Sequence, residues 1–429
     1  MTDNGQDVGS LTPAARTDYA VRAVRCDHRA DDEAVYEALA RATAPLARSW
    51  ARLGKARKIA VKLNQDFPKK LRVIWRGRRR QLVCDAVARA LFRLLRERTD
   101  AELVCVDAGF WQVHHHAEVA ETMSIGPILR EFDVRYVDGS QPPNRTCRVP
   151  GGGRMFREYT MVTELLDADA LVSVAKMKNH KLMGITGCLK NLFGLMPGTP
   201  WGRPRRYYHH LVRMPYVLAD IGRILDPALN VVDGLVAQAG MEWNKAEALG
   251  RVMDTLIAGD HAVATDACMA HLMGHDPTTD WLTQPFLRDR NALLVAAEGG
   301  FGTVDLDRID FASEPAPREP GVFYCHEREP LDLRVSWRRT MCEEALRYRD
   351  NRDKFKEYTG QYVLLQDGEV RWHSADGQLR QSRSRLSGNR PEHALFFKYV
   401  DPAETEGEHD EVYEQALAHL ETIGRHQNA

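Results

Sequence analysis

Apolar runs and amphipathic stretches alternate over the first three hundred residues of the chain. Residues 58–63 form an apolar run that predicts a buried strand, and residues 81–98 place their apolar side chains on one face of a helix. Residues 103–107 then predict a second strand. A strand, a helix and another strand in this order are typical of a parallel sheet.

The same pattern continues along the chain. Further strands are predicted at residues 134–137, 170–175, 230–233 and 255–258. Asp260 is placed to cap a helix over residues 262–273. We therefore expect an α/β fold, a Rossmann-like parallel sheet in two lobes, with a C-terminal α+β appendage.

Three segments follow from the same patterning. Residues 1–16 are polar and are predicted to form a disordered tail. Residues 17–314 are predicted to form the α/β core, and residues 315–429, which begin with a Pro-rich connector, a C-terminal α+β module. Within this module we expect an exposed charged helix over 338–356 and a hairpin over 361–372 that turns at Asp367-Gly368. A final amphipathic helix is expected over 410–425.

Composition excludes several classes of protein. The net charge of −1 carries no basic field, so we expect no nucleic-acid partner. None of the eight cysteines forms a C-x-x-C pair, so no iron–sulfur cluster is expected. The chain has neither a secretory signal nor an apolar run of about 18 residues, which predicts a cytoplasmic protein without a membrane contact.

Residues 176–198 carry an unusual concentration of chemistry. Burying lysine is costly unless it is paired or binds an anion. The segment is expected to start at a strand end and run into a helix, and it contains Lys176, Lys178, His180, Thr186, Lys190 and Asn191. A solvated amphipathic helix is the plain alternative to an anion site.

Other polar residues fall at or just past predicted strand ends, where open α/β sheets bind their ligands. They are Lys62, Asn64, Asp107 and Asp233. Asp266 lies one turn inside the predicted helix and is expected to face the same site.

Two further clusters add candidates. Residues 203–210 form a basic and aromatic patch in which Arg205 or Arg206 would bind a phosphate or carboxylate and His209 or His210 would be a base or a ligand. A surface loop is the alternative. In the run of histidines at 114–116, His114 is a candidate catalytic residue.

These motifs resemble the domain-of-unknown-function family 362 over roughly residues 55–305. The resemblance rests on the Lys-x-Asn at 62–64, the segment 176–198, the Asp-Gly at 233–234 and the Ala-Gly-Asp-His-Ala-Val-Ala-Thr-Asp at 258–266. His261 stands where the family usually has proline. Many members carry ferredoxin-like cysteine runs, which this chain lacks.

In spacing and order, the segment is also similar to nickel-pincer lactate racemases. In those enzymes a histidine is followed ten residues later by the lysine that anchors the cofactor, and His180 and Lys190 have the same spacing here. A later histidine of the racemases corresponds in order to His209 or His210. The resemblance implies isomerase chemistry and a transition metal, with His180, His209 and His210 as candidate ligands. The racemases' glycine-rich sequence before the lysine is replaced by residues 186–189.

The leading hypothesis is an enzyme, of isomerase, racemase or lyase type, that acts on a small carboxylate- or phosphate-bearing substrate by acid–base chemistry. His180, Lys190 and His114 would be catalytic. The substrate would be bound by Lys62, Asn64, Lys176, Lys178, Thr186, Asn191, Arg206, His210, Asp233 and Asp266. A homo-oligomer is compatible with the sequence.

Two alternatives remain at this point. The same cations would equally hold an anionic ligand or a metal cofactor in a binding or carrier protein without turnover. A tailoring enzyme that uses an activated carboxylate or acyl phosphate is the other, although the chain has no nucleotide-binding loop.

Overall fold

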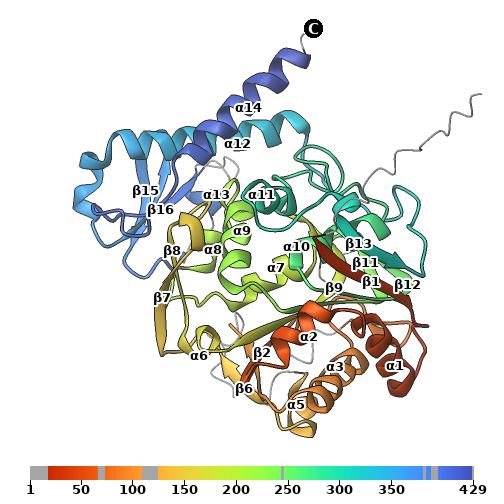
Figure 1. Cartoon of the computed structure of the whole chain (residues 1–429). Helices are drawn as coiled ribbons and strands as arrows, with labels where there is room; N and C mark the ends of the chain where they lie inside the picture. Colours follow the sequence, from red (N-terminus) through yellow and green to blue (C-terminus); the bar gives the residue numbers. More distant parts are fainter. Residues whose placement is uncertain are drawn as a thin grey trace, which may run out of the picture.

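The structure is a computed structural model and describes residues 18–65, 73–108, 124–242, 246–379, 383–387 and 395–427. Within these residues a nine-stranded sheet runs through the core in the order β13-β1-β12-β11-β9-β2-β5-β6, with β10 paired to β9 (Figure 1). Its strands are β1 (Tyr19–Arg25), β2 (Lys58–Leu63), β5 (Glu102–Asp107), β6 (Arg135–Asp138), β9 (Ala170–His180), β10 (Gly184–Thr186), β11 (Leu229–Gly240), β12 (Ala248–Gly259) and β13 (Ile309–Ser313).

The sheet is mostly parallel, as the alternation of strands and helices predicts. Strands β11, β9, β2, β5 and β6 pair in parallel. Strand β12 runs antiparallel to both of its neighbours, β11 and β1. The reversal arises because β11 and β12 are joined by a short hairpin connection, whereas a parallel pair needs a long crossover.

Helices cover both faces of this sheet, which is the α/β layer arrangement expected from the sequence (Figure 1). One apolar cluster joins Ile59, Val61 and Leu63 of β2 to the helices on one face, and a second joins Ala60 to those on the other. The first face carries α1 (Asp32–Thr43), α2 (Ala47–Leu53), α3 (Asp85–Arg98) and α5 (Gly126–Glu131). The second carries α7 (Cys188–Asn191), α9 (Arg213–Leu225), α10 (Ala262–Leu272) and α11 (Ala292–Glu298).

Smaller elements surround the sheet. They are the hairpin of β3 (Ile74–Trp75) and β4 (Arg78–Arg79), the pair β7 (Asn144–Arg148) and β8 (Glu158–Val162), α6 (Thr163–Leu166), α8 (Arg205–Tyr208) and the 3₁₀ segments Pro150–Gly152, Leu192–Leu195, Leu306–Arg308 and Arg352–Tyr358. The C-terminal part contains α12 (Leu331–Asp350), β14 (Tyr362–Gln366), β15 (Glu369–Ser374), α13 (Arg383–Leu386), β16 (Phe396–Tyr399) and α14 (Glu411–Gln427).

The C-terminal part confirms two predictions and corrects one. Strands β14 and β15 form the expected hairpin around Asp367-Gly368, and α14 is the expected last helix. The helix expected to be exposed over 338–356 is instead α12, which buries Trp337, Met341 and Tyr348. It is half-buried because it packs against α14 and the core, where the buried Arg338 pairs with Asp289 at 2.6 Å.

Two local expectations near the sheet edge are also corrected. The cap of α10 is His261, whose Nδ1 accepts the backbone N–H of Val263 at 3.2 Å, whereas Asp260 accepts the N–H of Ala20 on β1. The helix expected within 176–198 is only the short α7, because β9 continues to His180 and β10 folds back on it. His114 and the tail 1–16 lie outside the described residues.

In the part of the chain that the structure describes, none of the helices combines the length and the apolar character needed to span a membrane.

Candidate functional site

The long strand β9 organises the candidate site. The sequence predicts its end at residue 175, but all residues from 170 to 180 are buried strand. It extends because β11 flanks it on one side and β10 on the other. Lys176, Lys178 and His180 alternate along it and therefore share one face of the sheet. The site is thus built on a strand rather than on a loop after it.

Two of the predicted anion-binding lysines are held by carboxylates. Lys62 Nζ lies 2.8 Å from Asp107 Oδ2, and Lys176 Nζ lies 3.0 Å from Asp233 Oδ2, with all four side chains almost completely buried. Lys176 and Asp233 are also direct partners in the β9–β11 register. Pairing of this kind accounts for the burial of both lysines without any ligand.

Cys84 completes the surroundings of Lys176. Its Sγ lies 3.5 Å from Lys176 Nζ, and its backbone N–H donates to Asp233 Oδ2 at 2.7 Å. Burial raises the pKa of the Cys84 thiol to about 12, so the thiol is neutral and a poor nucleophile. This cluster joins the start of α3 to the centre of the sheet.

Asn191 and Asp266 contact the backbone around the site. The amide nitrogen of Asn191 donates at 3.1 Å to the backbone carbonyls of Lys62 and Val174, which ties α7 to β2 and β9. The carboxylate of Asp266 accepts the backbone N–H groups of Cys188 and Leu189 at 2.7 and 2.8 Å. Burial raises the pKa of Asp266 to about 7. Both side chains thereby hold α7 in place.

His180 has both ring nitrogens engaged. Nδ1 accepts the backbone N–H groups of Leu182 and Met183 at 3.1 and 3.2 Å, so the ring proton resides on Nε2. Nε2 lies 3.3 Å from Glu242 Oε1. Burial, and next the charge of Lys190, keep the pKa of His180 well below its usual value. His180 is therefore neutral at neutral pH, with its protonated Nε2 facing the Glu242 carboxylate.

His209 lies beside His180 in a cationic environment. The two ring centroids are 6.0 Å apart, and the ring of Phe193 is 5.6 Å from that of His209. Lys190 Nζ and Arg205 Cζ lie 5.0 and 4.7 Å from the centroid of the Phe193 ring. Burial, then Lys190 and Arg205, hold the pKa of His209 well below the usual value. The structure thus places two neutral imidazoles among cations.

Three other predicted residues lie differently. Arg206 is exposed. His210 is buried, and its ring lies 6.3 Å from that of Phe396 on β16. The backbone N–H of Asn64 donates to the Val174 carbonyl at 3.0 Å, so its main chain extends the β2–β9 pairing.

Lys178 and Thr186 are brought together, and with them residues that the sequence did not single out. Thr186 and Gln238 are both direct partners of Lys178, on β10 and β11 respectively, and Lys178 Nζ donates to the carbonyl of Gln81 at 3.2 Å. Glu242 follows β11 on its way to β12. Strand register alone selects Gln238, and no local sequence signal distinguishes Gln81 or Glu242.

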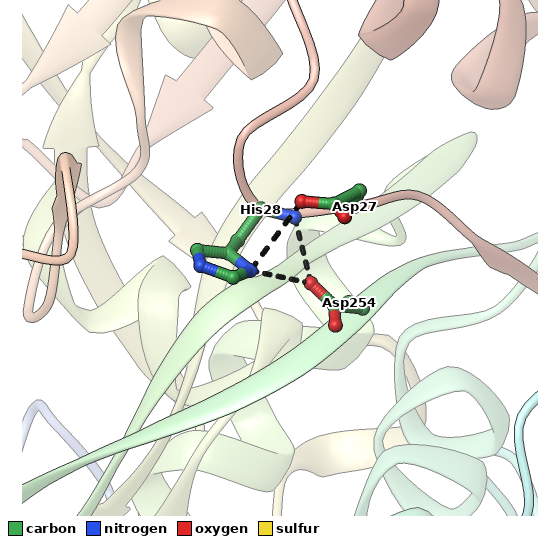
Figure 2. A group of neighbouring side chains, drawn as sticks. All are labelled: Asp27, His28 and Asp254. Carbon is green, nitrogen blue, oxygen red and sulfur yellow. Dashed lines mark hydrogen bonds and ion pairs between the residues drawn. The ribbon is translucent and has the colours of Figure 1, made fainter.

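The metal candidates His180, His209 and His210 do not form a three-ligand group in the described residues, where the one such group is Asp27, His28 and Asp254 (Figure 2). There, Asp254 Oδ1 lies 2.8 Å from His28 Nδ1, and Asp27 pairs with Arg29 at 3.1 Å. The pKa of Asp27 is lowered to about 2 by its hydrogen bonds from Arg29. Protein partners therefore account for this group without an ion.

Comparison with known proteins gives two matches. One is the "Thylakoid-associated protein sll1697" of Synechocystis sp., which is 25% identical over 166 residues, or 38% of this chain. The chain spans about half the length of that relative, 48%. The other match covers residues 73–271, which include α3, β9, α7, α9 and all but the last residue of α10. Over this stretch the chain matches the family described as "Domain of unknown function (DUF362)", in agreement with the resemblance seen in its motifs.

Proposed function

We propose that this protein is an enzyme that binds a small carboxylate- or phosphate-bearing substrate and moves a proton on it, as an isomerase, racemase or lyase. The observation that carries the proposal is the pair of neutral imidazoles, His180 and His209, whose ring centroids lie 6.0 Å apart. Lys190 and Arg205 lie over the ring of Phe193, which in turn lies beside the ring of His209. Neutral bases next to cations suit the removal of a proton from carbon beside an anionic group.

His209 is the better base of the two. Both nitrogens of His180 are occupied, by backbone N–H groups and by Glu242, so its role is to orient and to donate. The pKa of His209 is lowered, mainly by burial, which keeps its ring unprotonated at neutral pH. Lys190 would stabilise the negative charge that develops when the proton leaves carbon. His209 would therefore abstract the proton, and Lys190 would keep a catalytic role.

The similarity to nickel-pincer lactate racemases supports only the class of reaction in this proposal. A metal ligand needs an open nitrogen, and His180 offers none in this arrangement. Lys190 Nζ lies against the face of Phe193. Because these residues do not fit the metal-bearing group, no step of the proposed reaction passes through it.

The test is exchange of a substrate C–H proton with solvent. A panel of small hydroxy, keto and phosphorylated acids is incubated with the protein in D₂O and followed by NMR. His209→Gln and Lys190→Met are each expected to lower the exchange rate by roughly 100-fold or more, as for loss of a general base or a charge-stabilising group. His373→Gln, which alters an exposed histidine that contacts Gln361, is the matched control.

The pH dependence provides a second readout. Because the pKa of His209 is lowered, the base form persists below pH 6.5 and the exchange rate should stay high into the acidic range. An exchange rate that falls as the pH is lowered through 6.5, the ordinary pKa of histidine, would contradict the role of His209. Unchanged rates in both site variants would remove the enzymatic proposal.

A second candidate is a binding or carrier protein without turnover. The occupied nitrogens of His180 favour it, because a pure binding site needs fixed donors and no free base. Tight binding of a small anion without any proton exchange over days would support this candidate.

A further inference from the structure

Three polar side chains form a row across neighbouring strands at the end of β9. Lys178 is the direct partner of Thr186 on β10 and of Gln238 on β11. Directly opposed residues on neighbouring strands place their side chains on the same face, about 5 Å apart. The row is therefore fixed by backbone pairing. His180, two residues further along β9, lies on the same face.

Buried polar atoms along this row lack a partner. Thr186 Oγ1 and Gln238 Oε1 are buried without a hydrogen bond among the described residues, and the two residues are 4% and 1% exposed. Gln238 Nε2 donates to the carbonyl of Met241 at 2.8 Å, which fixes Oε1 as an acceptor. Gln81, whose carbonyl accepts from Lys178 Nζ, has a buried Nε2 with no acceptor.

Leaving such atoms unsatisfied destabilises the folded state, so their concentration around one lysine needs an explanation. Elsewhere on the sheet, Lys62 and Lys176 are satisfied by carboxylates. A ligand that enters the row would satisfy Thr186, Gln238 and Gln81 together. The unpaired atoms thus mark a binding position.

The identity of these atoms defines the ligand. The hydroxyl of Thr186 and Nε2 of Gln81 are donors, and Lys178 adds positive charge, so this side of the row suits an anionic oxygen. Oε1 of Gln238 needs a donor from the ligand. Lys178 disfavours an ammonium there, so the donor that fits is a hydroxyl.

We propose that Thr186, Lys178, Gln238 and Gln81 form a subsite for an oxyanion that carries a hydroxyl group beside it. The subsite deepens the proposed function, because it would hold the substrate's polar head next to His180, and it rests on that function for the reaction that follows. An organic hydroxy acid and hydrogen phosphate, whose own hydroxyl is a donor, share this chemistry.

Binding of glycolate, inorganic phosphate and acetate is measured by ligand-induced shifts in melting temperature, and the affinities are measured by titration calorimetry. Glycolate and phosphate carry both groups and acetate lacks the hydroxyl, so acetate is expected to bind at least tenfold more weakly than glycolate. A preference between glycolate and phosphate identifies the source of the oxyanion.

Thr186→Val and Gln238→Met remove the unpaired atoms with little change in shape. Thr186→Val is expected to melt no lower than wild type without ligand, whereas Gln238→Met also loses the hydrogen bond to the Met241 carbonyl and is expected to melt lower. Both are expected to lose at least tenfold in affinity for glycolate or phosphate. Ser49→Ala removes another buried hydroxyl without a partner, on α2, and should leave binding unchanged. Circular dichroism checks the fold of each variant.

The outcomes separate this inference from the proposed function. Binding that survives in both row variants but is lost in Lys190→Met overturns the subsite and leaves the enzymatic proposal standing. If binding is lost in the row variants and the wild type never exchanges a substrate proton, the subsite is supported and the enzymatic proposal is overturned. Failure of wild type to bind glycolate or phosphate at millimolar concentration, or equal affinity for acetate and glycolate, overturns the subsite.

Discussion

The interior of the central sheet and the far end of β9 surround their buried polar side chains differently. In the interior, Lys62 and Lys176 each meet a carboxylate within 3.0 Å. At the end of β9, Lys178 and His180 lie among side-chain atoms that have no partner, such as those of Thr186 and Gln238. A buried lysine is thus informative about ligand binding only after its protein partners are known.

The largest effect is expected where the interior pairing is broken. Asp233→Ala leaves Lys176 buried without its carboxylate and should lower the free energy of unfolding by about 3–5 kcal/mol. The double variant Lys176→Met, Asp233→Leu should recover part of that loss, because the pair is replaced by apolar groups while the Cys84 N–H still loses its acceptor. Urea unfolding measures both. A double variant as unstable as the single one would show that Lys176 needs Asp233 for more than charge.

The next effect concerns the close approach of Asp266 to α7. A Cβ at Gly187 would lie 2.2 Å from Asp266 Oδ1, so Gly187→Ala must displace the carboxylate that holds the start of α7. We expect a loss of about 1–3 kcal/mol in thermal or urea unfolding. Gly198→Ala is the matched control, because no atom lies within 4 Å of a Cβ there. Equal stability of the two variants would contradict the packing around Asp266.

A more gradual effect, smaller over any one pH unit, is expected in the pH dependence of stability. The pKa of Asp266 is raised by burial to about 7, above the ordinary value of 3.8. The folded state therefore holds this proton more tightly, and the resulting stabilisation is complete below pH 3.8 and is lost as pH rises through about 7. Relative to Asp266→Asn, wild type should lose stability between pH 4 and pH 7, by up to about 1.4 kcal/mol per pH unit.

Urea unfolding of both proteins at matched pH values gives that difference and cancels the contribution of other groups. His261 and His275 contribute in the opposite direction, because burial lowers their pKa to about 3 and about 4 and stability is lost as pH falls below 6.5. A difference between wild type and Asp266→Asn that grows with rising pH in favour of wild type would contradict the assignment.

The smallest effect is expected at Arg80, whose Nε, like Thr186 Oγ1, has no hydrogen bond within the described part of the chain. Its side chain is buried, its Nε has no acceptor, and burial lowers the pKa of its guanidinium. Arg80→Met keeps the aliphatic packing and removes the buried charge, so the free energy of unfolding should change by less than about 1 kcal/mol or increase. A loss comparable to that of Asp233→Ala would show that Arg80 is paired like the interior lysines.

Local patterning predicted the elements whose boundaries depend on nearby residues. The predicted strand at 58–63 has the same bounds as β2, and the hairpin turn at Asp367-Gly368 is confirmed. The length of β9 was not predictable, because Lys176, Lys178 and His180 look like loop residues until β10 and β11 supply their hydrogen bonds. The direction of β12 likewise depends on its pairing with β11.

The sequence by itself determined an α/β protein with a mostly parallel sheet, and it singled out residues 176–198 as the candidate site. Periodicity and residue type are local properties, so they were sufficient for these inferences. Only the tertiary structure decided that Asp107 and Asp233 neutralise Lys62 and Lys176, that Lys178 pairs with Gln238, and that His180 lies beside His209 and Glu242. Those relations join residues far apart in sequence through strand register and burial, which no local pattern encodes.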